Sequence, residues 1–491
     1  MEDNSTESGP PLDTARHIRY WQRCYKSLLP HHYTSMDSIR LTLGFFIVAA
    51  LELLSSASSY SEPPPDPRAS SLIPPADRKR LREFVLSLQH PLGGFCGSPN
   101  HVLPREWSVE WDAAQDREVA GDPVNPNIAA TYFALLLLGL LADGDGADAY
   151  DGVHREKTLS WLKRLQREEG SFGDVVNEHG FVSGGRDMRF CLLAATIRYI
   201  LGGDAASKED DIDVEALVAH IRRGQTFDGG ISESATHESH AGYAYCAVAA
   251  LSMLDLPYEE TSSSSSSSSS TDAGKISHLA AGISSVPSLI HFLGNRQFTY
   301  LTEDSDEDDD TADPTHILAD LDTLSLIDPA ATPAGFNGRL NKKLDTCYTW
   351  WVSGTLSILG ESGIVDRAPS RSFLLDKTQH VIGGFGKHPG SPPDVYHAYL
   401  GLAALSTLAS SSRGTREEGL GELDPRFCLG VEAVRRIKKG REGVLSRSCE
   451  VAASPSSREA QGEVDARHTS KSMAASADEV RQRLAIAAGR R

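Results

Sequence analysis

The stretch Gln379-His380-Val381-Ile382-Gly383-Gly384-Phe385 contains the pattern that decides the fold, because it recurs along the chain. An amphipathic segment ends on a glutamine, and a turn built on glycine and an aromatic residue follows. Glycine supplies the positive φ angles that tight reversals need, and we expect the aromatic ring to pack against the next helix. The other glutamines are Gln89, Gln166, Gln225 and Gln297. The other turns include Gly93-Gly94-Phe95, Gly170-Ser171-Phe172, Phe227-Asp228-Gly229-Gly230 and Gly335-Phe336.

Two kinds of helix are predicted on either side of these turns. The segments before the turns have one apolar face, as in Leu81, Phe84, Val85 and Leu88, or in Val214, Leu217, Val218 and Ile221. The segments after them are apolar on nearly all sides and must be buried. They are residues 128–141, 188–201, 241–254, 347–359 and 395–408, and residues 39–54 open the series without a preceding turn.

This alternation predicts an all-α protein. Six buried helices alternating with amphipathic ones, at a repeat of roughly 50 to 80 residues, favour an α/α toroid, a six-fold barrel of concentric inner and outer helices. An open helical solenoid is the alternative, although it would keep a more even repeat length.

The domain organisation follows from the repeat. Length alone would suggest two or three domains in 491 residues, but the repeat predicts one toroid over residues 15–440. Low-complexity insertions are expected near residues 259–275, which include a serine run, and near 299–333, which include an acidic run. Residues 1–14 and 441–491 are expected to be disordered.

Composition excludes some classes of function. The net charge of −19 argues against a nucleic-acid binder, which needs clustered Lys and Arg. The seven cysteines are odd in number and scattered, as in a reduced intracellular protein. The longest apolar stretch, residues 41–54, is shorter than the about 20 residues of a transmembrane helix, and no secretory signal precedes it. We therefore expect a cytoplasmic protein without a transmembrane segment.

Three residues in two of the buried helices could bind a metal: Asp345, Cys347 and His397. A carboxylate, a thiolate and an imidazole together would form a three-ligand zinc site, whose open fourth position accepts a substrate atom. The spacing alone leaves other interpretations open. An Asp at a helix start is commonly an N-cap, and a His in an apolar helix is commonly a hydrogen-bonded core residue.

Basic residues lie close to this group in the sequence. Arg339, Lys342 and Lys343 precede Asp345, and His240 opens another buried helix. Cations near helix N-termini can bind a phosphate-type anion, although a solvated basic turn would have the same composition. A zinc ion could bind a thiol, the cations could bind a leaving anion, and the apolar helices could enclose an apolar group. Together these features imply transfer of an apolar group from a phosphate ester to sulfur.

The residues around this predicted site closely resemble the signature of protein prenyltransferase β subunits. The resemblance lies in the stretches Gly335-Phe336-Asn337-Gly338-Arg339-Leu340-Asn341-Lys342, Asp345-Thr346-Cys347-Tyr348-Thr349-Trp350-Trp351, Asp187-Met188-Arg189-Phe190, Glu238-Ser239-His240-Ala241-Gly242 and Asp394-Val395-Tyr396-His397. It extends, in the same order, over about residues 17–439.

The resemblance implies a role for each matching residue. Asp345, Cys347 and His397 would bind one Zn²⁺, and the substrate cysteine would take the fourth position as a thiolate. His240, Arg339, Lys342 and Tyr348 match positions that hold the diphosphate; Arg189 matches one near the bound peptide, and Trp351 one lining the isoprenoid pocket. The family works as a heterodimer with a helical-repeat α subunit, so this chain alone is expected to be inactive.

Two further residues resemble the geranylgeranyl type I members of the family. Thr42 falls where farnesyl enzymes carry a bulky Trp, which leaves room for one more isoprene unit. Lys387 falls where farnesyl enzymes carry a magnesium-binding Asp, so no magnesium requirement is expected, unless Lys387 is an ordinary solvated lysine. The resemblance thus implies geranylgeranyl diphosphate as lipid donor. The acceptors would be proteins ending in a CaaX motif with Leu last, small GTPases among them.

One residue departs from the type I pattern. Tyr396 precedes the zinc histidine where type I enzymes tend to carry a smaller aliphatic residue, so the preference for the last CaaX residue stays open. A farnesyl or Rab-directed β subunit is therefore an alternative. Outside the class, a helical-repeat scaffold would lack turnover, and a terpene cyclase would need an acidic Asp-x-Asp-Asp motif in an inner helix.

Overall fold

The computed structural model describes residues 11–55, 71–100, 109–112, 117–120, 125–176, 181–206, 209–234, 236–264, 277–300, 332–410 and 419–453. The chain divides into a large unit, Met1–Arg441, and a second unit, Glu442–Arg491. The acidic run, most of the serine run and most of the predicted C-terminal tail lie outside the described residues.

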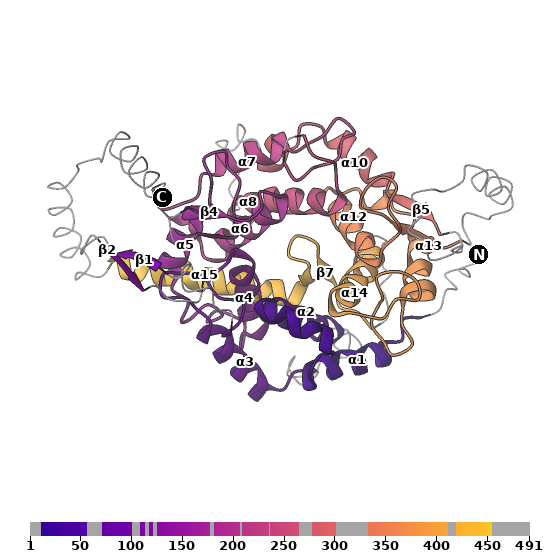
Figure 1. Ribbon diagram of the computed structural model, residues 1–491, viewed down its shortest axis with the longest axis horizontal. Helices are drawn as coiled ribbons and strands as arrows, with labels where there is room; N and C mark the ends of the chain where they lie inside the picture. Colours follow the sequence, from indigo (N-terminus) through magenta and orange to yellow (C-terminus); the bar gives the residue numbers. More distant parts are fainter. Residues whose placement is uncertain are drawn as a thin grey trace, which may run out of the picture. The chain divides into compact units, whose positions relative to one another are not determined.

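The inner ring consists of the apolar helices that the sequence predicts (Figure 1). They are α2 (Arg40–Ser55), α4 (Ile128–Leu141), α6 (Met188–Ile200), α8 (Ala241–Ser264), α12 (Thr346–Ile358) and α14 (Val395–Ser410). Each packs against the next along the chain, and α14 packs back against α2. This last contact closes the ring, so the predicted toroid is confirmed and the open solenoid is excluded.

An outer ring of helices surrounds the inner one (Figure 1). It contains α1 (Thr14–Lys26), α3 (Pro75–Ser87), α5 (Arg155–Arg164), α7 (Val214–Arg223), α10 (Val286–Gly294) and α13 (Arg367–Ser372), which continues into the π-helix η6 (Phe373–Thr378). Their apolar faces are buried against the inner ring, as in α7, where Leu217 and Ile221 are inaccessible to solvent.

Short antiparallel pairs and single helical turns connect the two rings. The pairs are β1 (Val109–Asp112) with β2 (Arg117–Ala120), β3 (Val175–Val176) with β4 (Val182–Ser183), β5 (Gln297–Thr299) with β6 (Ala334–Phe336), and β7 (Leu423–Asp424) with β8 (Leu429–Gly430). The remaining helices are η1 (His31–Ile39), η4 (Gly203–Ala205), α9 (His278–Gly282), η5 (Ser362–Ile364) and α15 (Val431–Ala453).

The recurring glutamines join each repeat to the next through their side-chain amides. The amide of Gln166 donates to the carbonyl oxygen of Asp213 at 2.8 Å and accepts from its N–H at 2.7 Å. Asp213 is the N-cap residue of the next outer helix, α7. Gln225 bonds in the same way to Ser285, and Gln297 to Asp366, the N-caps of α10 and α13. Each amide therefore continues the backbone hydrogen bonding across the gap between repeats.

The turn glycines bring the same neighbours into direct backbone contact. Gly170 has φ +95°, and a Cβ atom there would lie 2.0 Å from the carbonyl oxygen of Ala216 in α7. Only glycine can occupy such a position, because real Cβ atoms never approach backbone so closely. The aromatic residues of these turns, Phe95, Phe172 and Phe385, are fully buried. The sequence prediction is therefore confirmed for these turns. It is wrong for the turn at Phe227, because the Phe227 side chain is fully exposed and Ile231 is buried at the equivalent position.

The last repeat closes on the first through His17 of α1. The Nε2 atom of His17 lies 2.9 Å from Oε1 of Gln379, and its Nδ1 accepts from the N–H of Gly384 at 3.3 Å. His17 is fully buried, and burial lowers its pKa to about 4. A neutral imidazole thus takes the place that an N-cap backbone occupies in the other repeats.

One end of the inner ring is crossed by the segment that contains β7 and β8 (Figure 1). The hydroxyl of Tyr245 on α8 donates to the carbonyl of Pro425, and that of Tyr399 on α14 to the carbonyl of Cys428. The N–H of Gly421 donates to Leu53 on α2. These bonds tie the segment to helices on different sides of the ring.

Two boundaries extend beyond the sequence expectation. Helix α8 continues to Ser264, past the expected end at residue 254, and α15 continues to Ala453, past 440. Arg436 of α15 pairs with the buried carboxylate of Glu52, and Arg441 pairs with Asp204 at 2.7 Å. These ion pairs anchor the first turns of α15, although sequence composition favoured disorder after 440.

The N-terminal stretch His31–Ser55 is long and apolar enough to cross a membrane by length and composition. In the structure 67% of its most apolar part is buried inside the protein, because α2 is a member of the inner ring.

Replacing Gln166 by Leu should destabilise the toroid by about 1 to 3 kcal/mol, since two hydrogen bonds to Asp213 are lost. The measurement is the free energy of unfolding in urea. Gln22→Leu, in the body of α1, is the matched control and should have a smaller effect. Equal stability of the two variants would show that the amide does not link the repeats.

Candidate functional site

The residues singled out from the sequence lie at the N-terminal ends of inner helices or in the loops before them. Thr42, Arg189, His240, Cys347 and His397 come from the first turns of α2, α6, α8, α12 and α14, or directly precede them. Bonds from Ala241 to Gly338 and from Thr346 to Lys387, and the contact between His397 and Asp345, bring the starts of α8, α12 and α14 together, and with them the positive dipole ends of these helices.

Asp345, Cys347 and His397 are brought together. One potential ligand atom from each residue lies within 4.8 Å of the others, and Asp345 and Cys347 are buried. Nε2 of His397 is 3.3 Å from Oδ1 of Asp345. Ligands held at 2.0 to 2.3 Å by a tetrahedral zinc ion lie about 3.3 to 3.8 Å apart, so a small movement would fit the three to one ion.

Asp345 is also the N-cap of α12, the alternative that the sequence left open. Its Oδ1 accepts the N–H of Cys347 at 2.8 Å. The two functions are compatible, because a carboxylate has further lone pairs for a metal. The cap fixes the carboxylate beside the sulfur atom of Cys347.

Asp394 orients the histidine, which the sequence reasoning did not assign. Its Oδ2 is 2.6 Å from Nδ1 of His397, and its Oδ1 accepts the N–H groups of Tyr396 and His397. A proton on Nδ1 leaves Nε2 directed at Asp345 and Cys347, as in metal sites where a carboxylate holds the far side of the imidazole. The signal was an Asp three residues before a His at a helix start.

The electrostatics of the group favour a positive charge between its members. Burial alone would lower the pKa of His397, but hydrogen bonds to Asp345 and Asp394 raise it to about 9. Burial, followed by the charge of Asp345, raises the pKa of the Cys347 thiol well above its usual value. The proton on His397 therefore balances the negative charge of Asp345, as a metal cation would. A metal cation would also favour the thiolate form of Cys347 over the thiol.

Lys387 lies beside this group. Its Nζ is 4.0 Å from Oδ2 of Asp345, and about half of its side chain is exposed. The backbone carbonyls of Gly386 and Lys387 accept from the hydroxyl and the N–H of Thr346. These bonds fix the backbone of Lys387 next to the first turn of α12.

His240 and Tyr348 form a second pair. The N–H of Gly242 donates to Nδ1 of His240 at 3.0 Å, so the ring carries its proton on Nε2, 2.9 Å from the hydroxyl oxygen of Tyr348. Burial, then the charge of Arg339, lowers the pKa of His240 to about 4. His240 is therefore neutral at pH 7 and supplies a hydrogen bond, whereas the sequence analysis counted it among the cations.

The loop before α12 carries the basic residues. Arg339 pairs with Glu238 at 2.8 Å, and Lys342 and Lys343 are exposed. The N–H of Ala241 donates to the carbonyl of Gly338, which fixes this loop beside the start of α8. Glu238 is a neighbour of Arg339 that the sequence reasoning did not assign.

Arg189 and Thr42 lie on other inner helices, whereas Trp351 lies on α12, one turn after Cys347. The exposed guanidinium of Arg189 donates two hydrogen bonds to Asp187, the N-cap of α6. The ring of Trp351 packs 5.0 Å from that of Tyr245. Thr42 is half-buried in the first turn of α2. Phe46, one turn further along α2, packs edge-on against Tyr396, with ring centroids 5.6 Å apart.

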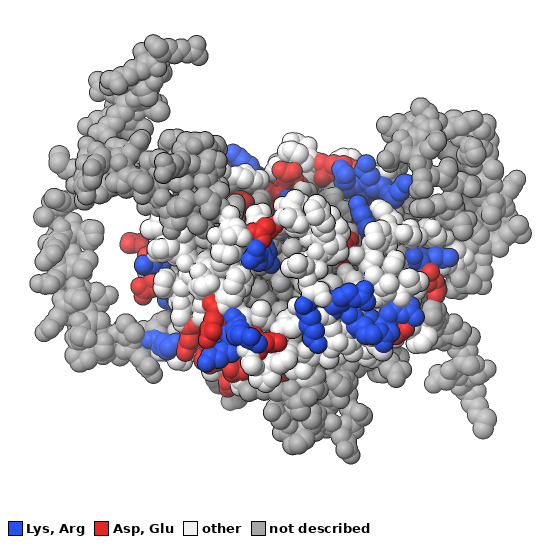
Figure 2. All heavy atoms as spheres, turned by 60° about the horizontal axis from the view of Figure 1, so that its bottom comes forward, with Lys and Arg blue, Asp and Glu red and all other residues white. Residues whose placement is uncertain are grey.

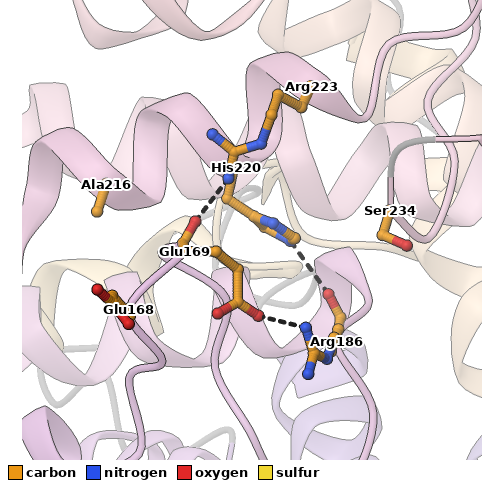
Figure 3. A pocket seen from close by; sticks show the side chains of 7 residues that line it. All are labelled: Glu168, Glu169, Arg186, Ala216, His220, Arg223 and Ser234. Carbon is orange, nitrogen blue, oxygen red and sulfur yellow. Dashed lines mark hydrogen bonds and ion pairs between the residues drawn. The ribbon is translucent and has the colours of Figure 1, made fainter.

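A surface pocket of about 400 Å³ lies elsewhere on the molecule (Figure 3). It is lined by Glu168, Glu169, Arg186, Ala216, His220, Arg223 and Ser234. Its polar groups bond mainly to one another: Glu169 pairs with Arg186, and His220 bonds to the carbonyl of Arg186 (Figure 3). None of the predicted site residues lines this pocket.

Charged side chains of both signs lie on the surface. On the face shown in Figure 2, Lys and Arg lie beside Asp and Glu in several places, and a group of Lys and Arg side chains gathers at the lower right.

Comparison with known proteins agrees with this fold. Two relatives are type-1 β subunits of geranylgeranyl transferase: one from Arabidopsis thaliana is 28% identical over 443 residues, covering 88% of this chain and 94% of that protein. One from Dictyostelium discoideum is 25% identical, covering 81% and 91%. A farnesyltransferase β subunit from Schizosaccharomyces pombe is 24% identical, covering 82% and 80%.

A solved structure supports the fold. The Candida albicans protein geranylgeranyltransferase-I complexed with GGPP matches with a TM-score of 0.62 and 24% identity, over 88% of this chain and 100% of that one. The family model of the prenyltransferase alpha-alpha toroid domain matches residues 12–429, which include both rings and every site residue named above. The chain therefore belongs to the prenyltransferase α/α toroid family.

Proposed function

We propose that this chain is the catalytic β subunit of a protein geranylgeranyltransferase type I. It would transfer a geranylgeranyl group from geranylgeranyl diphosphate to the cysteine of a C-terminal CaaX motif. The observation that carries the proposal is the convergence of Asp345, Cys347 and His397, with Lys387 beside Asp345. A metal site of this kind next to cations suits a reaction in which a thiolate bonds to a carbon atom as the bond from that carbon to a diphosphate breaks.

A zinc ion held by Asp345, Cys347 and His397 would lower the pKa of the substrate thiol, so that a thiolate forms at neutral pH. The protein groups then act on the diphosphate. Arg339, Lys342 and Lys387 would stabilise the negative charge that develops on the leaving group. His240 donates to the oxygen of Tyr348, which leaves the Tyr348 O–H available to donate to a diphosphate oxygen.

The relatives support a heterodimer. The Arabidopsis and Dictyostelium proteins are named as β subunits, so we expect an α subunit as partner of this chain as well. CaaX proteins with Leu last are the expected acceptors, and the cytoplasm is the expected compartment.

A farnesyl β subunit is the second candidate, and Tyr396 is the observation that favours it. The aromatic contact between Tyr396 and Phe46 narrows the space beside α2 and α14 relative to an aliphatic residue. Competition between farnesyl and geranylgeranyl diphosphate, using the zinc-loaded heterodimer and a peptide ending Cys-aliphatic-aliphatic-Leu, distinguishes the two.

Replacing Cys347 by Ala should remove a metal ligand and reduce transfer to background, while the apolar inner ring keeps the fold. Zinc content and single-turnover transfer are measured together. Asp394→Asn, which removes only the orienting carboxylate, should weaken zinc binding by about 10 to 100 fold. Full activity of Cys347→Ala without bound zinc would refute the mechanism.

If Lys387 takes the place of magnesium at the diphosphate, the wild-type enzyme should turn over in a magnesium chelator that spares zinc. Lys387→Asp should be slower, by about tenfold or more, and should respond to added magnesium. Lys163→Asp on α5 makes the same charge change and should have neither effect. A wild type that requires magnesium contradicts the type I assignment.

Replacing Thr42 by Trp should shift the lipid preference from geranylgeranyl to farnesyl diphosphate, because the larger side chain would fill the space for the last isoprene unit. Each CH₂ of that unit contributes about 0.8 kcal/mol when buried, less the cost of ordering it. The measurement is the ratio of kcat/KM for the two lipids, with Thr42→Ser as the control. An unchanged ratio, or a wild type that prefers farnesyl, would make Thr42 an ordinary helix residue.

A further inference from the structure

The residue before each recurring glutamine occupies an equivalent position in every repeat, and one repeat is exceptional. The residues are Leu88, Leu165, Gly224, Arg296 and Thr378. All five are buried, so the position belongs to the core of each turn. Leu fills it twice, which shows that the fold itself does not require a charge there. Arg296 is the exception, and its repeat directly precedes the loop with Arg339 and Lys342.

Arg296 is held in apolar and polar surroundings that do not neutralise it. The residue is only 4% exposed, and its guanidinium carbon lies 5.0 Å from the centre of the Phe292 ring and 6.0 Å from that of Phe298. Its Nε and Nη1 atoms are buried and have no hydrogen-bond partner among the described residues. Burial lowers the pKa of Arg296, and the charge of Asp228 opposes this shift.

One loop that carries proposed anion-binding residues is hydrogen-bonded to Arg296, and a second segment lies within reach of its charge. Its carbonyl oxygen accepts the N–H of Asn337 at 3.1 Å, and the Asn337 side chain donates to the carbonyl of Lys342 at 3.0 Å. Asn337 thereby holds together both ends of the loop that carries Arg339 and Lys342. The Oδ1 atom of Asn337 is itself buried without a partner among the described residues.

The second segment runs from Asp228 to His240. The carboxylate of Asp228 accepts from the hydroxyl of Ser239 at 2.6 Å, directly before His240. It also accepts from the N–H of Gly230 at 3.1 Å. The charge of Arg296 therefore acts on the segment that places His240, while its backbone holds the loop that places Arg339.

We propose that Arg296 is a positioning residue for the diphosphate site. Its buried charge and its bond to Asn337 hold the loop 337–342 and the segment 228–240 in the arrangement that binds the anion. The charge also adds attraction for a diphosphate, because water screens a buried cation poorly. This inference rests on the proposed prenyltransferase function. It adds a residue that lies beneath the substrate-binding surface and does not itself touch the substrate.

A positioning role and a structural role predict opposite changes in stability. A buried arginine with unpaired donors destabilises a fold, so Arg296→Leu, which restores the residue used in two other repeats, should leave the Tm unchanged or raise it. If Arg296 instead serves to stabilise the turn, the same variant should lower the Tm and leave anion binding alone.

The test uses the zinc-loaded heterodimer. Arg296→Leu should weaken binding of geranylgeranyl diphosphate and of inorganic diphosphate by about tenfold, with unchanged zinc content and unchanged KM for the CaaX peptide. Arg296→Lys keeps the charge and should recover most of the affinity. Arg223→Leu at the exposed end of α7 removes one positive charge one repeat earlier and is the matched control.

Each outcome decides a different question. Unchanged diphosphate affinity in Arg296→Leu, or an equal loss in Arg223→Leu, overturns the inference while the proposed function stands. A wild type that binds no prenyl diphosphate contradicts the proposed function itself. If Arg296→Leu does not fold, Asn337→Ala is the second variant. It keeps the charge of Arg296 and removes only the side-chain hydrogen bond to Lys342. It should then weaken diphosphate binding without loss of zinc, and unchanged binding would again overturn the inference.

Discussion

The hydrogen bonds between one side-chain amide and the backbone at the start of the next outer helix determine much of this structure. Through Gln166, Gln225 and Gln297, the end of one repeat is fixed to the N-cap of the next with two bonds of defined direction. Because both the donor and the acceptor of the amide are used, neither rotation nor sliding of one repeat against its neighbour is possible without breaking them. The turn glycines allow the close approach that these bonds require.

The position of the functional site is a consequence of this constraint. Each outer helix ends at the turn that leads into an inner helix, so fixing the turns also fixes the inner-helix N-termini at one end of the ring. Asp345 and His397 then meet although they are 52 positions apart in the sequence. Short local bonds, from Asp345 to the backbone of Cys347 and from Asp394 to His397, complete the alignment of the ligand atoms.

The sequence predicted the ring architecture because helical periodicity and turn glycines are local signals. It also placed the inner-helix starts within a residue or two, as at Ile128 and Met188, where polar residues give way to apolar ones. It could not predict the charge state of His240, which depends on burial and on Arg339 from a distant segment. The partners of Arg296 were equally inaccessible, since the loop that contacts it follows after the insertion at 301–331. Helix α8 extends beyond its apolar pattern because Leu256 is still buried in the core and Asp255 accepts the N–H of His278.

Closure through His17 has a consequence for the order of folding. Helix α1 is synthesised before its partners in the ring, Gln379 and Gly384, which follow more than 350 residues later; the hydrogen bond to Gln379 spans 362 positions. On a ribosome that adds about 5 to 20 residues per second, α1 must wait many seconds for these partners. During that time the apolar inner helices are assembled into an incomplete arc whose two ends expose core surface. A nascent chain of this kind is a natural client for chaperones, and contacts of such long range make closure a slow step.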